Sequence, residues 1–128
     1  MNPIIDTRPW GEFKRFTHNE PTTVKIITVN AGEELSLQFH KHRREFLKIL
    51  SGTGTMQIGD KKIPAEKGAE FFVEVGQHHR VSAGDEPLEF LEIAFGDFDE
   101  NDIVRLEDKY GRKGSPPSHE KTRLIFPA

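Results

Sequence analysis

Residues 34–58, ELSLQFHKHRREFLKILSGTGTMQI, contain three runs of alternating polar and apolar side chains, with a short basic segment between the first two. Successive side chains of a β-strand point to opposite faces, so a period of two predicts strands. The three strands are expected over 34–40, 45–51 and 53–58. This stretch therefore predicts an all-β fold in which each strand carries different chemistry on its two sides.

The same alternation continues on both sides of this stretch. Glycine and turn-forming polar residues separate the runs, and many short strands at such spacing are typical of a β-sandwich or barrel. A chain of 128 residues is the usual size of one domain. We expect a barrel core over about 20–96, preceded by a loop-like arm over 1–19. The further predicted strands are 23–29, 70–75, 78–83 and 88–95.

The period changes near residue 99. Apolar residues now recur at the spacing of a helix, at Ile103, Leu106 and Tyr110. Asp99 or Asn101 could cap its start, with Asp102 at the same start, and Gly111 could end it. We therefore expect a short C-terminal helix and a tail over 97–128, with the closing RLIF docked on the barrel or on a second subunit.

Composition excludes several classes of function. The net charge is −3 with acidic and basic residues intermixed, so no nucleic-acid-binding surface is expected. No apolar run approaches the roughly 20 residues that span a bilayer. The chain has no cysteine and no basic, apolar leader at its start. We therefore expect a cytoplasmic protein without disulfides, nucleic-acid partners or a membrane span.

The histidines point to a metal site. Four of the six histidines lie in two short segments, HKH at 40–42 and HH at 78–79. Strand alternation puts Gln38 and His40 on one face, and in a small barrel that face can point inward. Buried polar groups need a strong partner to offset the loss of hydration, and a divalent cation is a common one. Imidazole and carboxylate without thiolate suit Zn, Fe, Mn, Ni or Co.

The spacing of these residues resembles the two cupin motifs. From Gly32, five residues lead to Gln38, one more to His40, four to Glu45 and six to Gly52. From Gly68, five residues lead to Glu74-Val75-Gly76 and two more to His79. The segments RPWG, LSLQFHKHRRE, SGTG, HRV, PLEFLEI and NDIVRLEDKYGR further resemble the C-terminal isomerase domain of type II phosphomannose isomerase/mannose-1-phosphate guanylyltransferases.

This resemblance implies a single-domain cupin, a double-stranded β-helix or jelly-roll barrel that forms a homodimer. It also implies one bound divalent metal ion, with zinc as the first candidate and Mn, Fe, Co or Ni as the others. The implied ligands are Gln38, His40, Glu45 and His79, although the Gln38 amide could instead contact substrate. Arg105 or Arg112 of the last segment could fold back toward the barrel mouth.

The implied activity is metal-dependent aldose–ketose isomerisation of a sugar phosphate, as in mannose-6-phosphate isomerase. His42 lies outside the ligand set and is our candidate for carrying the proton, while Arg43 and Arg80 would hold phosphate or oxyanion charge. The alternative is a non-catalytic, metal-containing cupin that binds a sugar or sugar phosphate. It is favoured by Phe46, where the family commonly has histidine, and by the lack of a guanylyltransferase half. A third candidate is an iron oxygenase.

Overall fold

The computed structural model describes residues 3–111 and 125, and these residues form strands and no helix. The strands are β1 (Ile4–Arg8), β2 (Gly11–Arg15), β3 (Thr22–Val29), β4 (Leu37–Phe39), β5 (Arg44–Ser51), β6 (Thr53–Ile58), β7 (Lys61–Glu66), β8 (Glu70–Val73), β9 (His79–Ala83), β10 (Leu88–Phe95) and β11 (Val104–Glu107). The all-β prediction is confirmed. No helix in the described ranges is long and apolar enough to cross a membrane.

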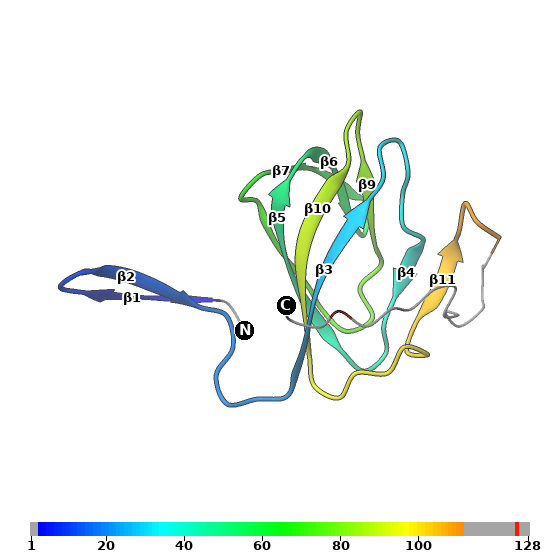
Figure 1. The fold of residues 1–128 in the computed structure, drawn as a ribbon. Helices are drawn as coiled ribbons and strands as arrows, with labels where there is room; N and C mark the ends of the chain where they lie inside the picture. The colour runs from blue at the N-terminus through cyan, green and yellow to red at the C-terminus, as the bar shows by residue number, and fades with distance from the viewer. Residues whose placement is uncertain (1–2, 112–124, 126–128) are drawn as a thin grey trace.

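Two antiparallel sheets make the barrel (Figure 1). One has the order β3-β10-β5-β8, and the other has the order β11-β4-β9-β6-β7. The pairing of β10 with both β3 and β5 places the C-terminal part of the barrel between two earlier strands. Strands β4 and β9 lie side by side, with Gln38 opposite His79. The two segments that contain the histidine clusters are therefore neighbours in one sheet.

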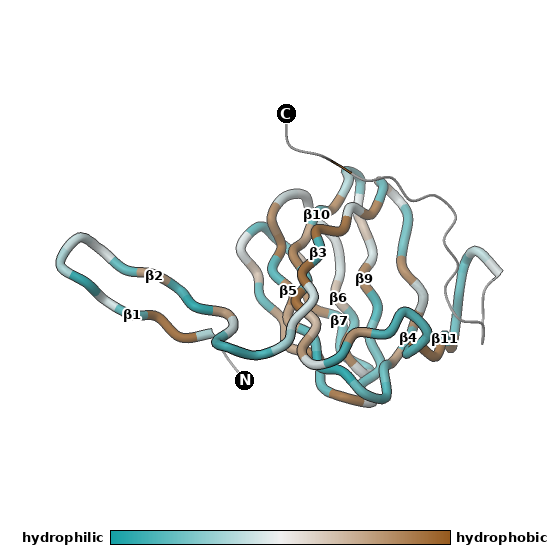
Figure 2. Tube along the Cα trace, turned by 60° about the horizontal axis from the view of Figure 1, so that its bottom comes forward, coloured by the Kyte–Doolittle hydropathy of each residue, from teal (hydrophilic) through white to brown (hydrophobic). Residues whose placement is uncertain are grey.

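The hydrophobic core lies between the two sheets. It includes Leu47 and Phe90 of one sheet and Met56 and Val81 of the other, each at most 1% exposed. Burial of each such side chain contributes roughly 1.5–3 kcal/mol. Figure 2 shows hydrophobic stretches on β3, β5 and β10. Strand β10 is apolar on both faces, because Leu88 and Phe90 point inward while Ile93 and Phe95 belong to a second cluster on the outer face.

Glycine at position 54 is required by close packing between strands. A Cβ atom added there would lie 2.0 Å from the carbonyl oxygen of Ser82 on β9. Gly52 precedes it with a φ of 84° and would place a Cβ 2.1 Å from the carbonyl oxygen of Pro87. The SGTG stretch therefore lets β6 pair tightly with β9 as the chain leaves β5.

The prediction of a C-terminal helix is wrong. Residues Val104–Glu107 form β11, which pairs with β4 and extends the second sheet. The residues that resembled caps stabilise turns instead: Asp99 Oδ1 accepts from the amide of Asn101 at 2.9 Å. Asp102 accepts from amides of another segment, residues 41–42. Backbone pairing along β4 outweighs the local helical spacing. The predicted tail docking through RLIF falls outside the described residues except for Ile125, which is exposed.

The N-terminal arm is not a loop as expected, because β1 and β2 pair along their full lengths as a hairpin. The hairpin extends to one side of the barrel in Figure 1. Its root packs on the outer face of the four-stranded sheet, where the rings of Phe16 and Phe46 are 5.2 Å apart. Sequence alternation over residues 4–8 and 11–15 is weak, so the sequence analysis does not predict these two strands.

Candidate metal centre

Three buried side chains from three segments meet at one end of the barrel. His40 follows β4, Glu45 lies on β5 and His79 begins β9. They are 2%, 1% and 4% exposed, and one ligand atom from each lies within 4.8 Å of the others. The structure therefore brings together three of the four ligands that the cupin spacing implies.

The tautomers of both histidines follow from their backbone partners. His40 Nδ1 lies 2.6 Å from the carbonyl oxygen of Asp102, and His79 Nδ1 lies 3.0 Å from that of Gln77. A carbonyl oxygen only accepts, so each Nδ1 carries the proton and donates it. In the neutral imidazole, each Nε2 then presents a lone pair toward the cluster.

The three lone-pair donors converge. The Nε2 atoms of His40 and His79 lie 3.3 Å and 3.4 Å from Glu45 Oε1. With no metal bound, burial alone would raise the pKa of Glu45, but hydrogen bonds and positive charge from the two histidines, in the form that also carries a proton on Nε2, outweigh burial and hold the pKa well below its usual range. A metal ion would take the place of these two Nε2 protons. Two imidazoles and one carboxylate without thiolate are the donor set of Zn, Fe, Mn, Co or Ni sites. The residues present therefore fit a divalent transition metal.

Gln38 lies next to this cluster on the same face of the sheet, opposite His79. Its Nε2 donates to the carbonyl oxygen and the hydroxyl of Ser36, at 3.3 Å and 3.0 Å. The carbonyl contact requires the NH₂ group on that side, so the amide oxygen is left for another partner. Its assignment as a fourth ligand stays a prediction.

The Arg43 side chain is buried beside the cluster. Its Nε donates to Glu45 Oε2 at 3.1 Å, and its Nη1 donates to the carbonyl of Asp99 at 3.1 Å. Its guanidinium also lies 4.5 Å from the centre of the Phe98 ring. Because residues 43 and 45 share a face, the arginine holds the second oxygen of Glu45 while the first faces the histidines.

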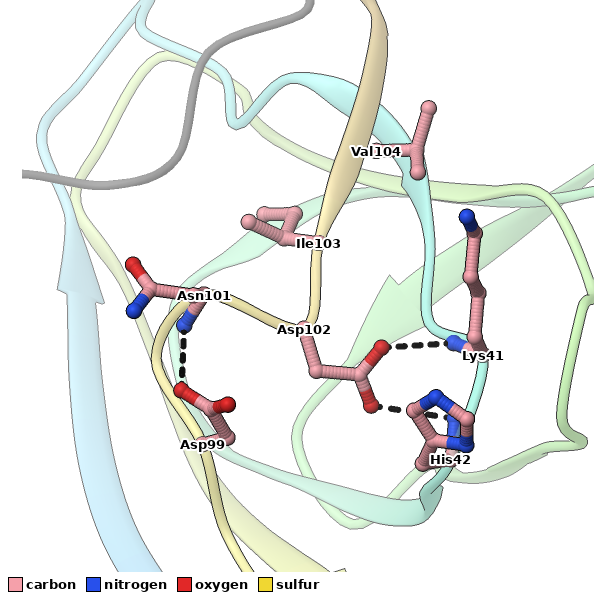
Figure 3. Close-up of a pocket in the computed structure, with 7 residues that line it drawn as sticks. All are labelled: Lys41, His42, Asp99, Asn101, Asp102, Ile103 and Val104. Carbon is pink, nitrogen blue, oxygen red and sulfur yellow. Dashed lines mark hydrogen bonds between the residues drawn. The ribbon is translucent and has the colours of Figure 1, made fainter.

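His42 and Arg80 lie away from the cluster. The His42 side chain is exposed and lines a surface pocket of about 390 Å³. Figure 3 shows this pocket, in which the Asp102 carboxylate accepts from the amides of Lys41 and His42 at 2.8 Å and 3.0 Å. Arg80 points opposite to His79 and donates to the Leu35 carbonyl and to Glu107. The catalytic roles of His42, Arg43 and Arg80 stay predictions.

Two further buried groups lie near the site: Glu92, which the sequence analysis does not single out, and Arg105, which it names as one of two arginines that could fold back toward the barrel mouth. Glu92 is 8% exposed, and burial, followed by the negative charge of Glu45, raises the pKa of Glu92 to about 8. Arg105 is 4% exposed and pairs with Gln38, which puts it in the row of Gln38 and His79. Alternation along 88–95 places Glu92 on the same face as Leu88 and Phe90, so its inward position could be predicted from the sequence. The position of Arg105 could not, because it depends on the pairing of β11 with β4.

The chain is similar to known proteins over most of its length. The family model for the mannose-6-phosphate isomerase C-terminal domain matches residues 5–108. The chain is 39% identical over 107 residues to the xanthan biosynthesis protein XanB of Xanthomonas campestris, covering 82% of this chain and 23% of that protein. It is 38% identical over 111 residues to the alginate biosynthesis protein AlgA of Pseudomonas aeruginosa, covering 85% and 23%. The chain thus spans about a quarter of the length of these relatives.

Solved structures with the same fold include a cupin protein from Bacteroides fragilis. Its TM-score is 0.55 at 29% identity, with 61% of this chain and 70% of that chain covered. A putative sugar phosphate isomerase from Acidithiobacillus ferrooxidans has a TM-score of 0.55 at 24% identity, covering 59% and 51%. These similarities identify the barrel as a cupin double-stranded β-helix, as the glycine and ligand spacing predicts.

Proposed function

The chain belongs to the family of mannose-6-phosphate isomerase C-terminal domains, and on that premise we propose that it is a metal-dependent aldose–ketose isomerase acting on a sugar phosphate. The observation that carries the proposal is the convergence of Nε2 of His40, Nε2 of His79 and Oε1 of Glu45 in a buried position. Zinc is the metal that we propose, with Mn, Fe, Co or Ni as the other candidates.

A bound divalent metal supplies Lewis acidity that polarises the carbonyl of the open-chain sugar. The chain's own residues provide the remaining requirements. The main-chain carbonyls of Asp102 and Gln77 accept the Nδ1 protons of His40 and His79, which leaves each Nε2 free to bind a metal. Arg43 holds Oε2 of Glu45 by a hydrogen bond. Arg105 shares the inward face with Gln38 and His79, which supports a role for its cationic group in holding phosphate or oxyanion charge.

Isomerisation also requires a base that moves a proton between C1 and C2 of the sugar. We propose the His42 imidazole for this step because of its spacing from the ligands in the sequence. Its exposed side chain lines the separate pocket beside Asp102, so the proposal requires the sugar to reach from the metal to that pocket. His42→Ala is then expected to retain metal and lose turnover, whereas His40→Ala loses both. If the His42 variant converts substrate at the wild-type rate, the proton is carried by another group.

The second candidate function is a metal-containing cupin that binds a sugar or sugar phosphate without catalysis. The sequence argument for it was Phe46, next to Glu45. The Phe46 side chain packs with Phe16 on the outer face, so it does not replace a group beside the Glu45 carboxylate. What still supports this candidate is that the chain covers only 23% of the length of its relative XanB, which is a much longer protein.

One experiment separates the candidates. Purified protein is assayed for metal by mass spectrometry and for interconversion of mannose 6-phosphate and fructose 6-phosphate in a coupled assay. Metal with turnover supports the isomerase. Metal with a thermal shift on addition of sugar phosphate but no turnover supports the binding protein, and iron with oxygen uptake supports an oxygenase. Turnover that is unchanged in Glu45→Gln contradicts a metal-dependent reaction at this site.

A further inference from the structure

The outer face of the four-stranded sheet carries an apolar cluster that the described part of the chain covers only in part. Its outward side chains include Phe46, Leu91 and Ile93, which form a cluster with Phe16. On β3, Val24 pairs with Ile93 and Ile26 pairs with Leu91, so both continue the same face. Yet Val24 is 58% exposed and Ile26 is 63% exposed. Strand β3 is also an outer strand of its sheet, with one neighbour among the described strands.

The N-terminal hairpin also carries exposed apolar side chains. It projects from the barrel (Figure 1). A two-stranded hairpin by itself is at best marginally stable in water, so it needs a surface to pack on. Its apolar side chains are mostly exposed: Ile4 49%, Ile5 60%, Trp10 74% and Phe13 37%.

The root of the hairpin already uses this sheet face. Phe16 contacts Phe46, and Lys14 pairs with Glu70 on β8. A pocket of about 340 Å³ lies between the root and the sheet, lined by Ile5 and Phe72 among others. This anchor ties the hairpin to the β8 side, whereas Val24 and Ile26 lie on β3 at the opposite edge. The hairpin and the bare part of the face therefore belong to one continuous surface that residues 3–111 of a single chain do not close.

We propose that a second copy of this chain closes this surface, with the hairpin of each copy packed over β3 of the other. The proposal specifies the surface for the homodimer that the sequence resemblance implies, and it goes beyond the proposed isomerase activity. Each copy offers both the donor hairpin and the acceptor face, which is the requirement for a two-fold interface.

The exposed apolar area suits such an interface. The six exposed side chains of the hairpin and β3 present on the order of 500 Å² of apolar surface per copy. A homodimer interface of standard size covers about 800 Å² per partner, of which about 65% is apolar. Trp10, the most exposed of the six, is the expected anchor, because tryptophan is enriched among residues whose loss weakens interfaces.

The first test is the mass of the protein in solution, by sedimentation velocity and light scattering. We expect a dimer for the wild type. Trp10→Ser and Ile26→Lys should each raise the dissociation constant by about tenfold or more, with an unchanged circular dichroism spectrum. Val75→Ser is the matched control, since Val75 is 49% exposed but lies outside the hairpin and the outer face. It should leave the dimer unchanged.

A second test uses the absence of cysteine from the chain. Thr7→Cys places one thiol on the hairpin, and Thr28→Cys places one on the exposed side of β3. A mixture of the two variants, refolded together and treated with a short bis-maleimide, should give crosslinked peptides joining positions 7 and 28 of different chains. A mixture of Thr7→Cys and Val75→Cys should not.

Three outcomes overturn the proposal. These are a wild-type chain that stays monomeric at its highest attainable concentration, a dimer that Trp10→Ser and Ile26→Lys leave unchanged, and crosslinks that do not join the hairpin to β3. All three readouts are independent of metal and turnover, so a failed isomerase assay leaves them interpretable.

Discussion

Glu45 and Phe46 are adjacent on β5, yet their environments are opposite. Glu45 points into the barrel, where two histidines and Arg43 meet its carboxylate. Phe46 points outward and meets Phe16 and other aromatic side chains. The inner group is charged and fully partnered, whereas the outer face is apolar and continues onto exposed residues of β3. A one-residue step along the strand thus separates the candidate metal site from the apolar face that we propose as the dimer surface.

Removing the inner carboxylate should have the largest effect. Glu45→Ala leaves Arg43 buried without its carboxylate partner, and breaking a buried ion pair from one side costs about 3–5 kcal/mol of unfolding free energy. The metal should be lost as well. Denaturant unfolding with metal analysis measures both effects, and Glu74→Ala is the control because Glu74 is exposed. A Glu45→Ala protein of wild-type stability would show that the inner network is not what holds this end of the barrel.

Removing the outer aromatic ring should lower stability and leave the metal. Phe46 is 3% exposed, and truncation of a buried phenylalanine to alanine costs about 3 kcal/mol or more. Phe46→Ala is therefore expected to unfold at lower denaturant concentration with the same metal content per chain. Loss of metal in a folded Phe46→Ala protein would contradict the separation of the two faces.

Asp102 should have a smaller effect, because its side chain serves the inner site indirectly. Asp102→Ala removes two hydrogen bonds to the amides of Lys41 and His42, at about 1 kcal/mol each. Its main-chain carbonyl still accepts from His40 Nδ1, so metal affinity should fall only modestly. Thermal unfolding and metal titration measure the two quantities, and Asp97→Ala is an exposed control in the same segment. Complete loss of metal would mean that the loop, rather than the ligands, defines the site.

The hairpin anchor should respond weakly to pH. Burial alone would raise the pKa of Glu70, but Lys14 and Lys48 outweigh it and lower the pKa below 4.5. The anchor therefore contributes stability above pH 4.5 and loses it as the pH falls through the lower folded value. Glu70→Gln should cost less than about 1 kcal/mol at neutral pH. Amide exchange of residues 4–15 should then be faster than in the wild type at pH 7, and the difference should vanish in acid.

Much of the site could be predicted from the sequence because it depends on short-range patterns. Alternation over 34–58 and 88–95 determined which side chains share a face, and the two glycine-to-ligand spacings brought His79 to His40 and Glu45. The same alternation, applied to Arg43, places it on the face of Glu45, where the structure shows their side chains paired. The inward position of Glu92 also follows from the alternation along 88–95.

The remaining features depend on long-range pairing. The spacing of Ile103, Leu106 and Tyr110 fits a helix locally, and only the backbone groups of β4 make β11 more favourable. Strand β7 was missed because KKIPAE contains a proline, which a strand at the edge of a sheet tolerates. Arg105 reaches the row of Gln38 only through the pairing of β11, and Arg112 lies outside the described residues.

The central claim is that His40, Glu45 and His79 bind one divalent metal through Nε2, Oε1 and Nε2. Calorimetric titration of the metal-free chain with Zn²⁺ tests it most directly, with His40→Ala and His79→Ala beside a His78→Ala control, since His78 is exposed and stacks on Phe39. The predicted result is one site per chain in the wild type and the control, and none in the other two variants. Zinc binding that survives in His40→Ala or His79→Ala, or a wild-type chain that binds none, would contradict the account.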